Sequence, residues 1–393
     1  MKIYEIGTGY TSIPAQISAA TEIVVEQLTK AMKKQGMDVT IIDICDKNRT
    51  KTELPIKEVK VPKMFVDADV QLGIVHKLKR VVYSVSLACT LKKILKQSDE
   101  RVVFHFHNQY NLFFFLKIVP IKLRNKCIMA YTNHSGIWRL DWKEIEGTIK
   151  KRYFQEAECM KKADIVYVLN EETKQNAMQH LGVKEENIVC IHNGVNTEVY
   201  RPLEALAKEG LKKQYELSGK KVILQVGSVY ENKGQKRAIE YLLPLLKDNK
   251  ELVYIYVGGI VSEEYQQEII DYAKKEGVSE QVKYMGMLSP GEELNGLYNA
   301  AEALIVASRY EGFSLVIVEA MAAGIPVLIE KNAPFSLGRG CIIYDEKRFV
   351  QIVNNSVLNN SNIYNAHCIE ARENAIEQYS WNRIASDYIN SWK

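Results

Sequence analysis

The feature that most constrains the fold of this chain is a regular alternation of short apolar segments with longer amphipathic ones. The sequence predicts strands at residues 2–6, 39–44, 101–106, 127–132, 164–169 and 188–191. Helical patterns lie between them, as at 20–34 and 77–96. One face of the second helix is marked by Leu78, Val81, Val82, Val85, Cys89 and Leu95. Strand–helix alternation of this kind predicts parallel sheets with helices on both faces.

The alternation pauses once, at "HNGVNTEVYRPLEALAKEG", where Asn193-Gly194 is a turn signal and Pro202 breaks helices. It then restarts, with strands expected at 221–226, 253–257, 282–285, 303–306 and 327–329. We therefore expect two similar α/β lobes joined near residues 195–205. Ligands of open parallel sheets bind beyond the carboxyl ends of the strands, so two lobes that face each other would enclose a cleft.

Composition limits the classes of protein that this chain can belong to. Of 393 residues, 47% are hydrophobic and 25% charged, which suffices for a core in each lobe. A net charge of +4 is too small to indicate nucleic acid as a partner. The seven cysteines include no CxxC pair, which favours reduced thiols. With no signal-peptide pattern and no apolar run of membrane-spanning length, we expect a cytoplasmic protein.

Two carboxylates stand out in "SRYEGFSLVIVEAMAAGIPVL", an otherwise apolar run. The pattern predicts a strand, a loop that holds Glu311, and a helix that starts near Ser314 and carries Glu319. Amide groups at the start of that helix suit a phosphate, and a carboxylate can accept hydrogen bonds from vicinal hydroxyls. From spacing alone, the alternative is a loop acid and a solvated helix face.

This run resembles the E-x7-E segment of retaining glycosyltransferases of the GT-B fold, family 4. The resemblance implies two Rossmann-like, doubly wound lobes that face a cleft. It implies that Glu311 contacts the transferred sugar and that Glu319 contacts the ribose of the nucleotide. The donor diphosphate and sugar would be held by the backbone amides of Gly312, Phe313, Ser314 and Leu315.

A second segment, "QVGSVYENKGQ", resembles the family's G-R-x4-K-G motif, whose two cations neutralise the donor diphosphate. Lys233 and Gly234 match the motif, and Ser228 stands at the arginine position. One positive charge near the leaving group is therefore lost. Candidates to replace it are Lys236, Arg237 and Arg309.

The first strand ends in "IGTGYTSIP", which has two readings. A dinucleotide-binding G-x-G-x-x-G motif fits Gly7 and Gly9, but its third glycine is Ser12 and Pro14 stands where the helix should begin. The family instead has a glycine-rich loop between donor and acceptor here, which implies Gly9 in donor binding. We place Tyr10 of this loop on the acceptor side.

Histidines follow two further strands. His134 in "YTNHSGIWRLDWK" matches the family histidine that contacts the donor sugar, and we place Trp138 and Arg139 on the acceptor side. Without the resemblance, a capping histidine and a packed tryptophan are the simpler interpretation. In "FHFHNQY", His105 and His107 share one strand face as metal ligands could. We expect no acidic or cysteine partner nearby and therefore a structural role.

The resemblance gives each region a role. Residues 1–195 would form the acceptor-side domain, residues 196–375 the nucleotide-sugar domain, and residues 376–393 a helix that crosses back to the first. The implied activity is retaining, metal-independent transfer of a hexosyl unit from a nucleotide diphosphate sugar, with UDP favoured, to a glycan, lipid-linked or small-molecule acceptor. No cofactor is implied. The alternatives are a nucleotide-sugar epimerase and a non-catalytic nucleotide-sugar binder.

Basic residues gather in the first half of the chain. Residues 76–97 carry six lysines and arginines and no acid, and "NLFFFLKIVPIKLRNK" combines phenylalanines with further basic residues. A basic face with apolar anchors suits anionic lipid, which would place the protein at the inner face of a membrane. The alternative is a solvated helix face with the phenylalanines in the core.

Overall fold

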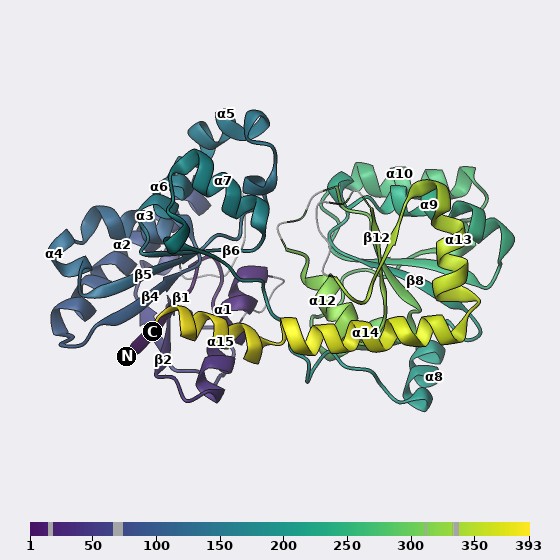
Figure 1. The fold of residues 1–393 in the computed structure, drawn as a ribbon, viewed down its shortest axis with the longest axis horizontal. Helices are drawn as coiled ribbons and strands as arrows, with labels where there is room; N and C mark the ends of the chain where they lie inside the picture. The colour runs from purple at the N-terminus through teal and green to yellow at the C-terminus, as the bar shows by residue number, and fades with distance from the viewer. Residues whose placement is uncertain (15–18, 66–73, 310, 312, 332, 334–337) are drawn as a thin grey trace. The chain divides into compact units, whose positions relative to one another are not determined.

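The computed structural model describes the chain except for residues 15–18, 66–73, 310, 312, 332 and 334–337. The chain forms two compact units, which we call unit 1 (Met1–Gly194 and Trp381–Lys393) and unit 2 (Val195–Ser380). Each is a parallel sheet with helices packed on its faces (Figure 1). This is the α/β architecture of two Rossmann-like lobes that the alternation predicts.

Unit 1 contains, within the described residues, a seven-stranded parallel sheet in the order β3-β2-β1-β4-β5-β6-β7. Its strands are β1 (Lys2–Ile6), β2 (Val39–Ile44), β3 (Ile56–Val59), β4 (Val102–Phe106), β5 (Cys127–Thr132), β6 (Ile165–Val168) and β7 (Ile188–Cys190). Its helices are α1 (Ala20–Lys34), α2 (Ile74–Gln97), α3 (Gln109–Ile118), α4 (Ile121–Arg124), α5 (Trp142–Arg152), α6 (Phe154–Lys162), α7 (Glu171–Leu181) and α15 (Trp381–Ser391).

The two faces of this sheet bury different cores. Tyr4 and Phe104 point to the side covered by α2 and α3, whereas Ile3 and Val103 point to the side covered by α1 and α15. Successive residues of a strand point to opposite faces, so a strand buried on both sides is apolar throughout. The C-terminal helix α15 thereby belongs to the core of unit 1.

Unit 2 contains a six-stranded parallel sheet in the order β10-β9-β8-β11-β12-β13, again within the described residues. Its strands are β8 (Lys221–Val226), β9 (Leu252–Val257), β10 (Val282–Tyr284), β11 (Ala303–Val306), β12 (Val327–Glu330) and β13 (Cys341–Tyr344). Its helices are α8 (Ala205–Gln214), α9 (Gln235–Asp248), α10 (Glu263–Lys275), α11 (Glu292–Ala300), α12 (Leu315–Ala322), α13 (Phe349–Val353) and α14 (Ser361–Tyr379).

Both sheets reverse their strand order at one point. In unit 1 the order reverses between β1 and β4, and in unit 2 it reverses between β8 and β11. The loops that leave neighbouring strands at such a point diverge to opposite faces of the sheet, which opens a crevice at the carboxyl ends. The motifs predicted to carry chemistry follow β1, β4 and β5 in unit 1 and β8 and β11 in unit 2.

The apolar stripe marked on α2 turns outward at its start, although its last member, Leu95, is fully buried. Leu78 and Val81 are 51% and 37% exposed, while Leu87 and Leu91 on the opposite side are fully buried. Lys79, counted among the basic residues of this helix, is also buried and donates a hydrogen bond to the carbonyl of Tyr10 at 3.2 Å. Apolar residues surround this helix, so the marked stripe does not coincide with the side that packs.

Among the described helices, none combines the length and apolar character that a bilayer span requires.

Substitutions on the two sides of α2 test this assignment. Leu87→Ala should lower the free energy of unfolding by about 2–5 kcal/mol, because it leaves a cavity in a packed core. Leu78→Ala, in the same helix, should change it by less than about 0.5 kcal/mol. Urea denaturation followed by circular dichroism measures both. Equal losses in the two variants would contradict the orientation of the helix.

Candidate functional site

The loop after β1 is held in place by side chains from α2 and α3. Gly9 has a φ of +79°, and a Cβ there would lie 2.1 Å from the ring of Tyr83. The hydroxyl of Tyr83 donates to the carbonyl of Gly7 at 3.1 Å, and the side-chain amide of Asn111 donates to the same oxygen at 3.0 Å. Only glycine fits at position 9, because a side chain there would overlap the ring of Tyr83.

Tyr10 lies in the same loop and is fixed by its neighbours. The side-chain amide of Asn108 donates to the Tyr10 hydroxyl at 2.8 Å, and the guanidinium of Arg80 stacks 4.4 Å from the ring centroid. Arg80 and Lys79 therefore shape this loop, although the sequence had suggested a lipid-facing role for the basic residues of this helix.

Two sequence-predicted acceptor residues have little exposed surface. Trp138 is fully buried, and its indole N–H donates to Glu156 at 2.6 Å. The side chain of Arg139 is 8% exposed and forms a 3.3 Å ion pair with Glu172. We therefore leave Trp138 out of the acceptor site proposed below, because its side chain has no surface with which to contact a ligand.

A buried polar cluster joins the ends of β1, β4 and β5. The Glu5 carboxylate lies between His105 and His107. His107 Nδ1 in turn lies 3.1 Å from His134 Nε2. The expectation that His105 and His107 have no acidic neighbour is wrong, because parallel pairing sets Glu5 directly beside His105. Sequence reasoning missed Glu5. Its signal was an acid within a strand that is apolar on both sides.

In unit 2, the two predicted catalytic residues meet in an ion pair. Lys233 Nζ lies 2.5 Å from Glu311 Oε1, and the hydroxyl of Ser308 donates to the same oxygen at 2.7 Å. Lys233 ends a 3₁₀ turn, Glu231–Lys233, that follows β8, and Glu311 follows β11. Both side chains are largely buried. The reversal point of the sheet thus brings together two motifs that lie 78 residues apart.

Gly234 allows this approach. It has a φ of +69°, and a Cβ there would lie 2.3 Å from the carbonyl oxygen of Ala307, so any other residue would push the Lys233 turn away from β11. Arg237 donates a hydrogen bond to that same carbonyl oxygen. Of the three cations considered as replacements for the missing arginine, it is the one bonded to the end of β11. Lys236 instead pairs with Glu268 at 3.3 Å, and Arg309 is exposed.

The helix after Glu311 forms as expected. Ser314 is the N-cap residue of α12, and its hydroxyl makes no capping hydrogen bond. Gly324, at a φ of +77°, ends the helix with paired backbone bonds in which Ile325 N–H donates to Ala320 and Gly324 N–H to Met321. Phe313, Ser314 and Leu315 lie at its start. Gly312 lies outside the described residues.

Glu319, on α12, lies between two tyrosines. The hydroxyl of Tyr298 donates to Glu319 Oε2 at 3.0 Å, and the Tyr200 hydroxyl also faces the carboxyl group. The residue keeps some exposed surface, but its carboxyl group is enclosed, and this burial raises the pKa of Glu319 to about 7.

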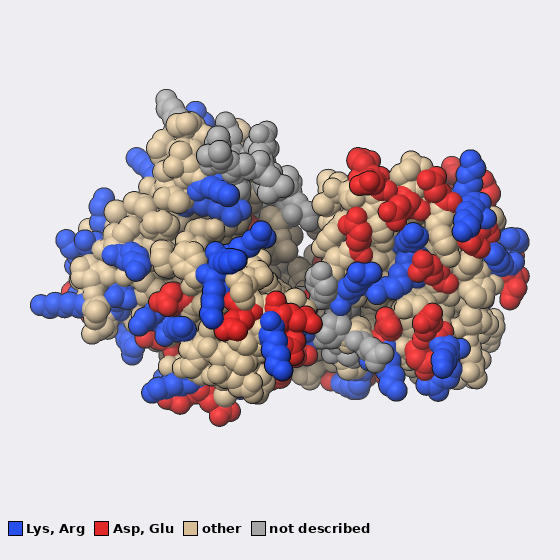
Figure 2. Space-filling model, turned by 90° about the horizontal axis from the view of Figure 1, so that it is seen from above, with Lys and Arg blue, Asp and Glu red and all other residues tan. Residues whose placement is uncertain are grey.

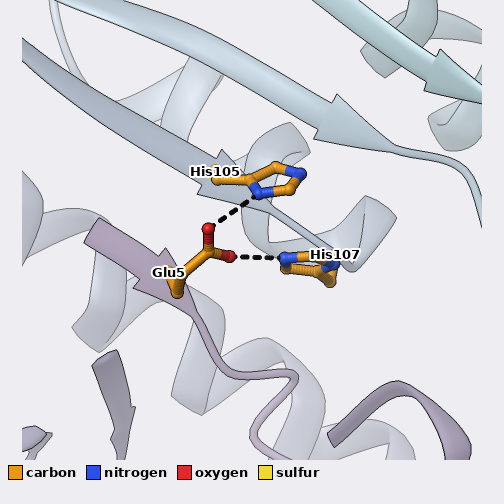
Figure 3. A group of neighbouring side chains, drawn as sticks. All are labelled: Glu5, His105 and His107. Carbon is orange, nitrogen blue, oxygen red and sulfur yellow. Dashed lines mark hydrogen bonds and ion pairs between the residues drawn. The ribbon is translucent and has the colours of Figure 1, made fainter. Parts of the chain in front are cut away.

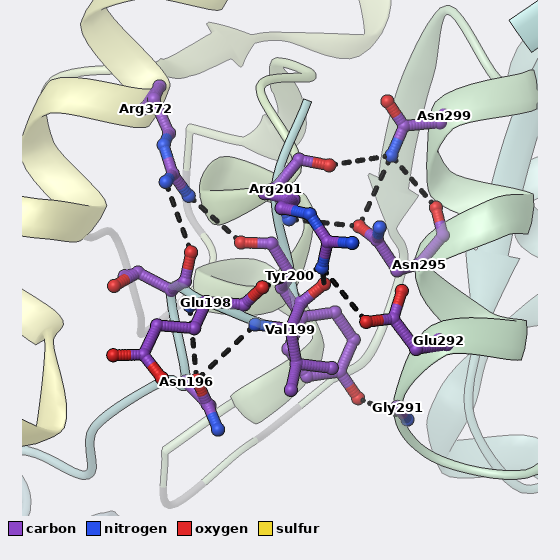
Figure 4. Close-up of polar contacts among 11 residues, drawn as sticks. Asn196, Glu198, Val199, Tyr200, Arg201, Gly291, Glu292, Asn295, Asn299 and Arg372 are labelled. Carbon is purple, nitrogen blue, oxygen red and sulfur yellow. Dashed lines mark hydrogen bonds and ion pairs between the residues drawn. The ribbon is translucent and has the colours of Figure 1, made fainter. Parts of the chain in front are cut away.

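Tyr200 belongs to the segment that begins unit 2, which is bonded tightly to the rest of that unit (Figure 4). The guanidinium of Arg372 on α14 donates to the carbonyls of Tyr200 and Thr197 at 2.8 and 3.1 Å. Asn295 on α11 accepts from the amide of Arg201 at 3.0 Å. The position of Tyr200 beside Glu319 is therefore fixed from several elements.

Comparisons with known proteins give matches over most of the chain. The family model described as glycosyl transferases group 1 matches residues 207–336, and the model described as glycosyltransferase family 4 matches residues 21–199. The first contains the Lys233, Glu311 and Glu319 motifs, and the second contains His134.

Among curated relatives, mannosylfructose-phosphate synthase of Agrobacterium fabrum is 24% identical over 282 residues, which are 66% of this chain and 62% of the synthase. The match thus spans less than two thirds of that relative. An uncharacterized glycosyltransferase of Methanocaldococcus jannaschii is 25% identical over 319 residues, 75% of this chain and 76% of its own.

Among solved structures, HepE of Anabaena superposes with a TM-score of 0.70 and 15% identity, over 100% of this chain and 99% of its own. Sucrose-phosphate synthase of Thermosynechococcus elongatus gives a TM-score of 0.73 at 17% identity, over 100% and 98% of the two chains. At these identities the likeness shows the fold.

Proposed function

Since this chain belongs to the family 4 glycosyltransferases of the GT-B fold, whose group 1 model matches the second unit, we propose that it transfers a hexosyl unit from a nucleotide diphosphate sugar. Unit 2 binds the donor, and unit 1 binds the acceptor and contributes His134. The family makes the chain a transferase. The donor, the acceptor and the stereochemistry are our proposal.

The observation that carries the proposal is the Lys233–Glu311 ion pair at the reversal point of the unit 2 sheet. A cation and a carboxylate side by side suit a ligand that has phosphates next to sugar hydroxyls. Lys233 would move to the diphosphate and Glu311 would accept hydrogen bonds from the transferred sugar. Glu319 would accept from the ribose hydroxyls, with the start of α12 holding the phosphates.

UDP is the donor nucleotide that we favour. The HepE structure contains UDP and glucose, whereas the starch synthase IV catalytic domain of Arabidopsis thaliana, which has a TM-score of 0.76, contains ADP. Glucose, N-acetylglucosamine or a related hexose is the transferred unit. Neither Lys233 nor Glu319 distinguishes one base from another.

The proposed reaction proceeds with retention and without a protein nucleophile. An acceptor hydroxyl attacks the anomeric carbon from the side of the departing phosphate as the bond to that phosphate oxygen breaks. The hydroxyl proton moves to the departing oxygen. Lys233 stabilises the charge that develops on the diphosphate, which is the electrostatic contribution expected of such a group. With Ser228 at the arginine position, Arg237 is the further cation that we assign to this region.

A screen of nucleotide sugars by thermal shift, followed by product analysis with the best ligand, tests the proposal. Transfer to an added acceptor, with the donor's anomeric configuration kept, supports it. Interconversion of two nucleotide sugars without an acceptor would identify an epimerase. Binding without any turnover or hydrolysis would identify a non-catalytic binder.

A second proposal concerns the acceptor. We propose that the outward stripe of α2 contacts anionic lipid, which would bring a lipid-linked acceptor within reach. Leu78 and Val81 are exposed near the start of α2, and the basic residues Lys93 and Lys96 are exposed near its end. Lys and Arg side chains are also spread over the unit 1 face seen in Figure 2. Phe115 takes no part, because it is fully buried in the core.

Removing either member of the ion pair tests the site. Lys233→Ala and Glu311→Ala should each reduce kcat at least 100-fold, as expected for loss of a group that stabilises developing charge or holds the reacting sugar. Lys247 and Glu276 form a matched 2.9 Å ion pair elsewhere in unit 2. Lys247→Ala and Glu276→Ala should retain normal turnover. Activity close to wild type in folded Lys233→Ala would remove the assignment.

Donor affinity should depend on pH through Glu319. Only the ionised carboxylate accepts two hydrogen bonds from the ribose, and burial raises its pKa to about 7. Lowering the pH from 8 to 6 protonates it, so the donor Kd should rise about tenfold. Glu319→Gln should bind more weakly at pH 8 and lose most of this dependence. Calorimetric titration measures both, and an unchanged pH profile in the variant would refute the role.

Sedimentation with liposomes tests the lipid contact. The chain should bind vesicles that contain anionic phospholipid and not neutral ones, and binding should weaken as salt is raised. The double variant Leu78→Gln/Lys93→Gln should bind several-fold less. Leu206→Gln changes a leucine of unit 2 that is more exposed than Leu78, and it should bind as the wild type does. Equal binding to both vesicle types would exclude the proposal.

A further inference from the structure

The buried cluster at the ends of β1, β4 and β5 is a continuous chain of hydrogen bonds. Figure 3 shows the Glu5 carboxylate between two imidazoles, with Oε1 3.0 Å from His105 Nδ1 and Oε2 2.7 Å from His107 Nε2. None of the three side chains is appreciably exposed. A carboxylate in such a place is stable only where hydrogen bonds compensate for lost hydration.

The chain extends in two directions from Glu5. On one arm, His107 Nδ1 lies 3.1 Å from His134 Nε2. On the other, His105 Nε2 lies 2.7 Å from the hydroxyl of Thr132, which lies 3.2 Å from the hydroxyl of Tyr388 on α15. His134 is thus linked to Glu5 through the imidazole of His107. Tyr388 is linked to Glu5 through His105 and Thr132.

The charge of Glu5 fixes the direction of the first arm. Burial raises the pKa of Glu5, but the attraction and hydrogen bonds of His105 and His107 outweigh it and bring the pKa down to about 2. An ionised carboxylate only accepts, so His107 Nε2 must carry a proton. Burial and the neighbouring His105 lower the pKa of His107 to about 4. His107 is therefore neutral near pH 7, and its Nδ1 has a lone pair.

The same reasoning determines which ring nitrogen of His134 carries the proton. A lone pair on His107 Nδ1 requires a proton on the nitrogen that faces it, His134 Nε2. Burial lowers the pKa of His134 well below its ordinary value, so its second nitrogen, Nδ1, is unprotonated. Among the described residues, none forms a hydrogen bond to His134 Nδ1.

We propose that Glu5 and His107 are positioning residues that hold His134 as the Nε2–H tautomer, so that His134 Nδ1 presents a hydrogen-bond acceptor to a hydroxyl group of a ligand bound by unit 1. That this ligand is a substrate of sugar transfer rests on the proposed function, whereas the tautomer follows from the hydrogen-bond chain together with the charge states of Glu5, His107 and His134. A mobile histidine would offer a donor and an acceptor in turn. The chain from Glu5 removes that ambiguity, so that the site would recognise a hydroxyl that donates.

A metal ion is the competing occupant of this cluster. One carboxylate and two imidazoles are a familiar ligand set, and their ligand atoms all lie within 4.8 Å of one another. Binding a metal would displace the protons that His105 and His107 donate to Glu5. It would thereby remove the asymmetry that fixes His134, so the two interpretations predict different protonation of the rings.

Nitrogen NMR of ¹⁵N-histidine-labelled protein near pH 7.5 tests the tautomer directly. The His134 ring, assigned by its loss in His134→Gln, should show a protonated Nε2 and an unprotonated Nδ1. In Glu5→Gln the side-chain amide can donate as well as accept, so the His134 nitrogens should become averaged or reversed. His107→Gln should do the same and is the second variant if Glu5→Gln does not fold.

Tyr388→Phe is the matched control, because it alters the opposite arm of the same buried chain. It should leave the His134 signals unchanged. A protonated Nδ1 in the wild type would overturn the proposal, as would an unchanged His134 pattern in both Glu5→Gln and His107→Gln. Displacement of the His105 and His107 signals by stoichiometric Zn²⁺ would establish the metal site in its place.

Measurements of sugar transfer distinguish the positioning role of Glu5 from the proposed function. Glu5→Gln should lower kcat for sugar transfer at least tenfold while leaving the Kd of UDP unchanged, since the nucleotide is assigned to unit 2. If the His134 tautomer responds as expected but no nucleotide sugar is a substrate, the proposed function fails and the positioning stands. If transfer proceeds normally in Glu5→Gln, the positioning role fails and the proposed function stands.

Discussion

Parallel pairing of β1 with β4 and of β8 with β11 is the constraint on which both units depend. At these pairs the strand order reverses, and the loops at the carboxyl ends diverge. In unit 1 the pairing sets Glu5 beside His105, and in unit 2 it brings the turn of Lys233 against the loop of Glu311. Glycines at positions 9 and 234 complete the arrangement, because a side chain at either would separate the loop from its support.

Several carboxylates are buried, and different groups compensate each of them for its lost hydration. Glu5 is stabilised as an anion by two imidazoles, so its pKa falls. Glu319 has two tyrosine hydroxyls around it, and Glu156 has an indole and two hydroxyls, so burial raises the pKa of each to about 7. Glu319 and Glu156 lack the attraction of a neighbouring imidazole, so burial outweighs their hydrogen bonds. Both acids therefore change charge near neutral pH, and of the two, Glu319 is the one that we assign to the donor.

The sequence predicted the architecture better than the orientation of its parts. Apolar runs bounded by turn signals gave the bounds of strands such as Cys127–Thr132 and Lys221–Val226 correctly. Two short edge strands were missed, Ile56–Val59 and Cys341–Tyr344. The first has few apolar residues, and the second lies within an atypical segment. The stripe through Leu78 on α2 faces outward, because a helix with apolar residues all round does not reveal which side packs.

The sequence by itself determined the two α/β lobes, the motifs at the strand ends and the residue types with which they meet a ligand, since these depend on local periodicity and on spacing along the chain. Only the tertiary structure decided which of those side chains touch. Glu5 precedes His105 by 100 residues, and Lys233 precedes Glu311 by 78. Such pairs follow from strand order and register, which arise from packing across the whole sheet and leave no trace in any one segment.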